Sequence, residues 1–371
     1  MSIEFAPVNQ EWFEEGSLRA SAFFRGEVPD RIPSNPFAMS YCARLFGYTI
    51  NDWYTNPTFG VKSTLAAFEL HDIAPMIMWL YAVYWTEDYG GKIKMPTGRM
   101  SAPAVVDSPI KEPEDVDKFE VLSIEELKKG PTMKAHYEAL EAAKKLTGKF
   151  FAPYQFPYGM YTVAGFWASP ERLMYWTNKR PDLVHKIMQK VVDHSVNINK
   201  LVADEYGSAS IITGSILAGS QTLSPEQCKE FNIRYLKEMV ERSLKAGAGP
   251  MVLYHLCGDH KRDWRLHDIV PITPATVMHV AYEGPEVADY TNVMEVFGNK
   301  CCLLGNFPTT LMQLGSPKEV YDEAKKHVLL CKESPKGYIF GCACELPPFA
   351  TPGNVNAYMK AAKDYGKLSK A

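Results

Sequence analysis

The residues best suited to chemistry in this sequence are one histidine and two cysteines. An apolar run that begins at Val252 ends in His255-Leu256-Cys257 and then a glycine. On a β-strand, side chains two residues apart point to the same face, so His255 and Cys257 are expected to point together. An imidazole and a thiolate are ligands that suit zinc. The third ligand is expected to be Cys344, which follows a second apolar run late in the chain.

Two alternatives to this metal site stay open on the sequence alone. A free cysteine is commonly a small buried hydrophobic residue, and a single histidine is commonly a core residue. Cys342 also competes with Cys344, because the two share a face if the strand continues that far. We favour Cys344, since it lies beyond the apolar run, where the chain turns at Pro347-Pro348.

One histidine and two thiolates would leave a zinc ion with an open position. Structural zinc is closed by four protein ligands, whereas catalytic zinc keeps a site for water or substrate. No Cys-x2-Cys pair is present to close the shell. Glu283, Glu345 and Asp259 are candidates for a fourth ligand, and Asp259 is better explained as a solvated loop charge.

Strands and helices alternate along most of the chain. Extended segments are expected near residues 36, 75, 151, 210, 253, 278, 303 and 340, with helices between them, including one over 182–205. Ser224-Pro225-Glu226-Gln227 and Ser316-Pro317-Lys318-Glu319 are capping boxes that begin two further helices. This count predicts an α/β protein of the (β/α)8 TIM-barrel class, a single domain over residues 1–371. Residues 1–34 are expected to be an N-terminal helical extension and residues 86–107 a hairpin-like insertion.

The barrel would place the three metal ligands at one end. Active sites of this fold lie at the C-terminal ends of the strands. His255 and Cys257 would end the fifth strand, and Cys344 would follow the eighth.

Composition excludes several classes of protein. The chain has 371 residues, 46% of them hydrophobic, and a net charge of −3, so a nucleic-acid partner is not expected. No apolar run is long enough to span a membrane, and the N-terminus does not resemble a signal peptide. Eight cysteines without a short secreted framework favour reduced thiols in the cytoplasm.

Aromatic residues are abundant, with 20 Tyr, 18 Phe and 7 Trp. They concentrate in two stretches, which are either core filling or a flat apolar substrate pocket. On the second interpretation the substrate-binding residues are Trp79, Tyr81, Tyr84, Tyr154, Phe156 and Tyr158.

Several segments, in this order, resemble the uroporphyrinogen decarboxylase superfamily over nearly the whole chain. They are Pro29-Asp30-Arg31-Ile32-Pro33, the connection 109–115, Gly305-Asn306 with 314–320, and 341–348 with 351–355. His-x-Cys with a late Cys is similar to the zinc-dependent, corrinoid-linked methyltransferase branch. The resemblance implies Zn2+ bound by His255, Cys257 and Cys344, and it places Asn306 among the substrate-binding residues.

The resemblance also implies a reaction and a partner. We expect transfer of a methyl group from a methoxylated aromatic compound to the Co(I) of a corrinoid protein. The sequence lacks an Asp-x-His-x-x-Gly corrinoid signature, so cobalamin would arrive on that partner. His279 and Glu283 are candidate catalytic residues that would move a proton or orient substrate, although His279 is equally well explained as a core residue.

Three alternatives remain. The first is a methylcobamide:thiol methyltransferase of the coenzyme M type. The second is an enzyme like uroporphyrinogen decarboxylase itself, which the lack of an Arg-rich N-terminal segment disfavours. The third is a non-catalytic barrel stabilised by zinc. The oligomeric state is open, with a homodimer as one option.

Overall fold

A parallel sheet in chain order is the centre of the molecule. The computed structural model describes residues 5–79, 85–98, 102–149, 154–155, 159–281 and 290–368. Within them, six strands pair in the order β3-β4-β5-β6-β7-β8, every neighbouring pair parallel. They are β3 (Tyr154–Gln155), β4 (Ser210–Ser215), β5 (Val252–Cys257), β6 (Thr276–Ala281), β7 (Cys302–Phe307) and β8 (Tyr338–Cys342).

Two earlier segments extend this sheet beyond β8. Ser34 forms a parallel bridge with Phe340, and the Asn35 amide donates to the Phe340 carbonyl over 2.9 Å. The Ala74 amide in turn donates to the Ser34 carbonyl over 2.9 Å. Eight extended segments therefore follow one another, close to the eight positions expected from the sequence.

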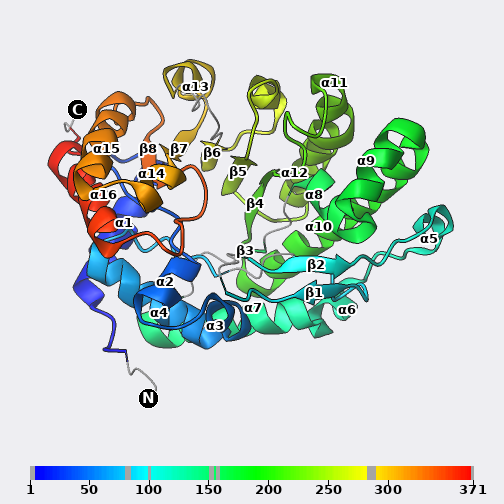
Figure 1. The fold of residues 1–371 in the computed structure, drawn as a ribbon, viewed down its shortest axis with the longest axis horizontal. Helices are drawn as coiled ribbons and strands as arrows, with labels where there is room; N and C mark the ends of the chain where they lie inside the picture. Colours follow the sequence, from blue (N-terminus) through cyan, green and yellow to red (C-terminus); the bar gives the residue numbers. More distant parts are fainter. Residues whose placement is uncertain are drawn as a thin grey trace.

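Helices surround the strands on the outside (Figure 1). They are α1 (Gln10–Ser21), α2 (Ser40–Leu45), α3 (Ile50–Thr55), α4 (Pro57–His71), α5 (Pro113–Lys118), α6 (Ile124–Lys129), α7 (Pro131–Thr147), α8 (Met160–Ala168), α9 (Pro170–Lys179), α10 (Pro181–Tyr206), α11 (Pro225–Cys228), α12 (Arg234–Lys245), α13 (Tyr290–Phe297), α14 (Thr309–Leu314), α15 (Pro317–Cys331) and α16 (Pro352–Tyr365), with short helical turns at Phe23–Arg25 and Trp264–Ile269. None of the helices in these described residues combines the length and the apolar character needed to cross a membrane.

Local sequence signals begin and end these helices. Ser224 and Ser316 form the two predicted capping boxes, each hydroxyl accepting from the amide three residues later. The long helix α10 has Pro181 at its first position and ends at Gly207, whose φ is 76°. Between α11 and α12 the chain forms a π-helical turn at Lys229–Ile233, a feature that often occurs beside functional sites.

The strands from β4 to β8 are buried along nearly their whole length because both of their faces are covered. Every residue of β4, β6, β7 and β8 is buried. This pattern is typical of parallel sheets, where helices cover one face and barrel-filling side chains the other. Among the five strands whose side chains are described, β5 alone departs from it, with His255 and Cys257 partly exposed near its C-terminal end.

The N-terminal helix α1 lies across the opposite end of the barrel. Its residues Phe13 and Ala20 line an apolar cavity of about 430 Å³ together with Ser210, Met251 and Val277, which lie at or near the starts of β4, β5 and β6. This helix therefore does not cover the C-terminal ends of the strands, where the candidate metal ligands lie.

A separate antiparallel pair lies within the stretch where the sequence predicts an insertion. β1 (Lys92–Lys94) pairs with β2 (Ala104–Asp107), and neither strand joins the barrel sheet.

Candidate metal centre

His255 and Cys257 lie at the C-terminal end of β5, as the sequence predicts. Both are partly exposed. Tyr254, which precedes them, and Leu256, which lies between them, are buried on the other face. The two-residue repeat of the strand explains this alternation. The imidazole and the first thiol therefore point together toward the mouth of the barrel.

Cys344 meets them from the other side of the mouth. It lies two residues beyond β8, and its Sγ is 3.5 Å from Sγ of Cys257. One ligand atom from each of His255, Cys257 and Cys344 lies within 4.8 Å of the others. Two sulfur ligands at 2.3 Å on a tetrahedral zinc would be about 3.8 Å apart, so the geometry fits the ion.

Cys342 does not take part in this cluster. It belongs to β8 and is fully buried, two residues after Phe340, which stacks on Tyr358 of α16 at 4.1 Å. Residues two apart share a face, so Cys342 points toward the helix layer. This supports the choice of Cys344 over Cys342.

A second histidine, His279 on the neighbouring strand, forms a hydrogen bond with His255. The register of β5 and β6 places His279 opposite His255, and their Nδ1 atoms are 2.8 Å apart. His279 Nε2 lies 3.0 Å from the Cys342 carbonyl, which can only accept, so Nε2 carries a proton. Burial holds the pKa of His279 well below its ordinary value, so the ring is neutral and its Nδ1 accepts. His255 therefore donates from Nδ1 and keeps the Nε2 lone pair for a metal ion.

The two thiols are close enough to form a hydrogen bond with each other. The hydrogen bond from Cys257 holds the pKa of Cys344 well below its usual value, although burial acts to raise it. A thiolate is the form that binds metal. The contact between the two sulfurs thus favours the thiolate form of Cys344.

Neither of the two described candidates for a fourth ligand joins the cluster. Asp259 accepts from the Lys261 amide in an exposed turn. Glu345 accepts from both the amide and the hydroxyl of Ser40 at the start of α2. Among the described residues, the cluster therefore has three protein ligands. Glu283 lies outside the described residues.

The structure describes the side chains of only two of the predicted substrate residues, Trp79 and Asn306. Trp79 is fully buried, and its indole N–H donates to the Trp53 carbonyl over 3.0 Å, so it is a core residue and does not line the site. Asn306 is also fully buried, near the end of β7, and its substrate contact stays a prediction. Only the backbone of Tyr154 is described, and Tyr81, Tyr84, Phe156 and Tyr158 lie outside the described residues.

Phe37 is a site residue that the sequence did not reveal. Its ring stacks on His279 at 5.2 Å and lies 6.2 Å from His255. Its φ is 54°, a left-handed conformation that costs a non-glycine residue energy and is common at functional sites. The Asn35 side chain holds the turn by accepting from the Phe37 amide over 2.9 Å. The extended segment expected near residue 36 includes Phe37, but no sequence pattern marked it as a site residue.

Comparisons with known proteins agree with the fold and the family. The family model for uroporphyrinogen decarboxylase (URO-D) matches residues 17–365. A methylated-thiol–coenzyme M methyltransferase of Methanosarcina mazei is 26% identical over 211 residues, which are 55% of this chain and 51% of that protein. The aligned part thus spans about half the length of this curated relative.

A solved structure of a methyltransferase from Methanosarcina mazei superposes with a TM-score of 0.77 at 19% identity, covering 94% of this chain and 98% of that one. This likeness shows a shared fold and agrees with the predicted barrel. The family match extends over nearly all of the chain and confirms the resemblance inferred from the sequence. The chain belongs to the uroporphyrinogen decarboxylase (URO-D) family.

Proposed function

We propose that this protein is a zinc-dependent methyltransferase that works with a corrinoid protein. The observation that carries the proposal is the cluster of His255, Cys257 and Cys344 at the barrel mouth, with three ligand atoms within 4.8 Å. Three ligands of this kind are typical of a catalytic zinc, which keeps a position for substrate. The Methanosarcina mazei relative, a methylated-thiol–coenzyme M methyltransferase, supports the same class of reaction.

Two thiolates and one neutral imidazole give the bound ion a site of roughly zero net charge. When bound, the zinc would supply a Lewis acid for the sulfur or oxygen atom that carries the methyl group. The chain's own contribution is to orient the ligands: His279 fixes the tautomer and direction of His255, and Phe37 packs against both rings. In this role His279 is a positioning residue.

The proposed reaction is the transfer of a methyl group from a heteroatom to a corrinoid. The electron pair of the broken bond would stay with the heteroatom, and the reduced corrinoid of the partner protein, when bound, would supply the pair for the new bond to the methyl carbon. The mouth formed by the C-terminal ends of the strands is where that partner would approach.

We propose a methoxylated aromatic compound as the methyl donor. The apolar and aromatic character of the chain near the mouth supports an uncharged planar substrate, Phe37 being the described example. A methylated thiol is the second candidate, because the curated relative acts on such compounds and a thiolate-rich zinc binds sulfur well.

A parallel methyl-transfer assay tests both the class and the donor. Zinc-loaded protein is mixed with reduced cobalamin and, in separate reactions, a methoxyaromatic, methylthiol, methylamine or methanol. Methylation of cobalamin by the methoxyaromatic alone supports the first donor, and methylation by methylthiol alone supports the second. Decarboxylation of uroporphyrinogen, with no methyl transfer from any donor, would overturn the proposed class.

A further inference from the structure

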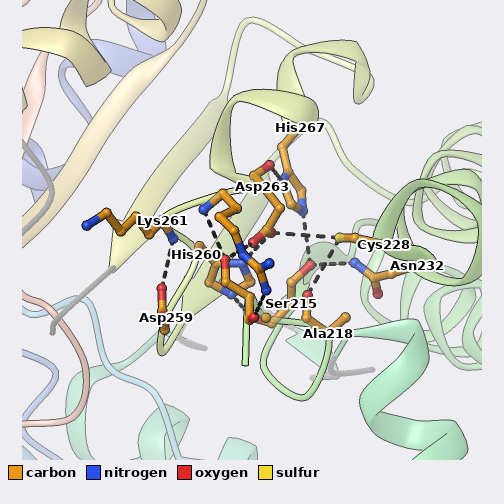
Figure 2. A network of polar contacts seen from close by, with 12 residues as sticks. Ser215, Ala218, Cys228, Asn232, Asp259, His260, Lys261, Asp263 and His267 are labelled. Atoms are coloured by element: carbon orange, nitrogen blue, oxygen red, sulfur yellow. Dashed lines mark hydrogen bonds and ion pairs between the residues drawn. The ribbon is translucent and has the colours of Figure 1, made fainter. Parts of the chain in front are cut away.

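A buried ion pair lies directly beyond the metal-binding end of β5 (Figure 2). Nδ1 of His260 is 2.6 Å from Oδ2 of Asp263, and the two residues are 0% and 2% exposed. Burying two such groups is unfavourable unless every polar atom finds a partner. Here every polar atom of both side chains does.

The partners fix where the protons lie. His260 Nε2 faces two carbonyl oxygens, Ser215 at 2.8 Å and Cys257 at 3.1 Å, so it must carry a proton. Asp263 Oδ1 accepts from the hydroxyl of Ser220, which itself accepts from the Arg262 amide. Burial acts to raise the pKa of Asp263, but the hydrogen bond from His260 and the other contacts hold it below its ordinary value. His260 therefore donates from Nε2 to the two carbonyls, while its Nδ1 is paired with Asp263.

The two carbonyls that His260 binds are those of the last residues of neighbouring strands. Ser215 ends β4 and Cys257 ends β5. One imidazole N–H ties both strand ends together. The next residue, Gly258, has a φ of 89° and directs the chain into the turn that carries His260 back beneath Cys257.

The same region holds a second group of potential metal ligands, Cys228, Asp263 and His267, all buried. Its atoms are already engaged in hydrogen bonds. Asn232 donates to Ser215 Oγ, so that hydroxyl donates to His267 Nε2 over 3.0 Å and occupies its lone pair. Burial keeps the pKa of Cys228 well above its usual value, so it stays a thiol. The cluster is thus joined by hydrogen bonds to the network around His260 and Asp263.

We propose that His260, held by Asp263, is a positioning residue that fixes the backbone of Cys257 and thereby the place of its sulfur in the metal centre. The inference rests on the proposed metal-binding function of Cys257. Side chains that orient metal ligands typically contribute ten- to a hundred-fold to metal affinity. A shift of the Cys257 backbone would move its sulfur relative to Cys344, now 3.5 Å away.

Two matched variants of the full chain isolate the imidazole N–H. Asp263→Asn removes the buried charge but lets a neutral His260 keep its Nε2–H on the Cys257 carbonyl. His260→Phe/Asp263→Asn removes that donor as well, without leaving a carboxylate unpaired. Zinc affinity is measured by competition with a chromophoric chelator, and Co(II) binding by the sulfur-to-cobalt absorption, which reports thiolate coordination.

We expect the double variant to bind zinc about ten- to a hundred-fold more weakly than Asp263→Asn, with an altered cobalt spectrum. His260→Gln, which keeps one N–H donor, should recover part of the affinity. Cys228→Ala is the packing control: it touches the same carboxylate at 3.7 Å but not Cys257, and it should match the wild type.

The outcomes separate this inference from the proposed function. If the wild type binds neither zinc nor cobalt, the metal centre itself is wrong. If the wild type binds both metals and the double variant matches Asp263→Asn in affinity and spectrum, only the positioning role is wrong. A loss in Cys228→Ala as large as that in the double variant would also refute the specific role of His260.

Discussion

Cys257 and Cys344 approach each other at the barrel mouth while Cys342 faces the helices, so these cysteines should respond differently to mutation. We expect Cys257→Ala and Cys344→Ala each to reduce bound zinc from about one ion per chain to near zero, because two ligands rarely hold zinc. Zinc analysis after gel filtration measures this, with circular dichroism to show that the barrel remains folded.

Cys342→Ala is the matched control, and it should keep its zinc. Wild-type zinc in Cys344→Ala, or its loss only in Cys342→Ala, would show that the wrong cysteine was chosen. Unfolding of the two ligand variants would instead favour a zinc-stabilised scaffold over an enzyme.

At the level of residues, the sequence predicted the cluster of candidate ligands but not the residues that support it. His-x-Cys at a strand end and a late cysteine were enough to select His255, Cys257 and Cys344, because strand periodicity is local. The bond between His255 and His279 depends on the register of β5 against β6, which no local pattern specifies. The burial of Trp79 was not foreseen for a related reason: an aromatic residue has the same local pattern in a pocket as in a core.

Among the helices, α15 offers a clean test of local stabilisation. The Ser316 hydroxyl accepts from the Glu319 amide, and the Glu319 carboxylate accepts from the Ser316 amide over 2.8 Å. We expect Ser316→Ala to lower the free energy of unfolding by about 1 kcal/mol, since it leaves a helix amide without its cap. Urea unfolding measures the change, and Ser316→Thr, which keeps the hydroxyl, should lose less.

Bound zinc should not change in Ser316→Ala, because α15 contributes no ligand to the cluster. A stability equal to that of the wild type would mean that packing, and not the cap, determines where α15 begins.

Elements were predicted better than contacts. Pro and Ser signals gave the starts of α11 and α15, and apolar runs gave the strands near residues 210, 253, 278, 303 and 340. The π-helical turn at Lys229–Ile233 was not expected, since the sequence there reads as one continuous amphipathic helix. That turn carries Asn232, which donates to Ser215 in the network beneath Cys257.

For the molecule as a whole, buried neutral histidines make stability depend on pH. Burial lowers the pKa of His136 and His194 to about 3, below the value of about 6.5 in an unfolded chain. Their stabilising effect is therefore complete above pH 6.5 and is lost progressively as the pH falls below it. Each contributes a slope of up to about 1.4 kcal/mol per pH unit near pH 5, because unfolding takes up one proton.

The variant His136→Leu tests the contribution of His136 to this pH dependence. The residue is 1% exposed on α7, and leucine is close to histidine in volume. Between pH 4.5 and 5.5, we expect the slope of unfolding free energy against pH to fall by about 1.4 kcal/mol per unit relative to the wild type. Chemical denaturation at several pH values measures it. An unchanged slope would mean that His136 is already protonated in the folded protein.

The position of the three metal ligands along the chain has one more consequence. Cys257 and Cys344 are 87 residues apart, and the segment between them includes β6, β7 and β8. An ion held by both sulfurs is a reversible cross-link that closes a long loop, so it restricts the unfolded chain much as a disulfide would. The stability of the segment that contains β6, β7 and β8 would then increase with the concentration of free zinc.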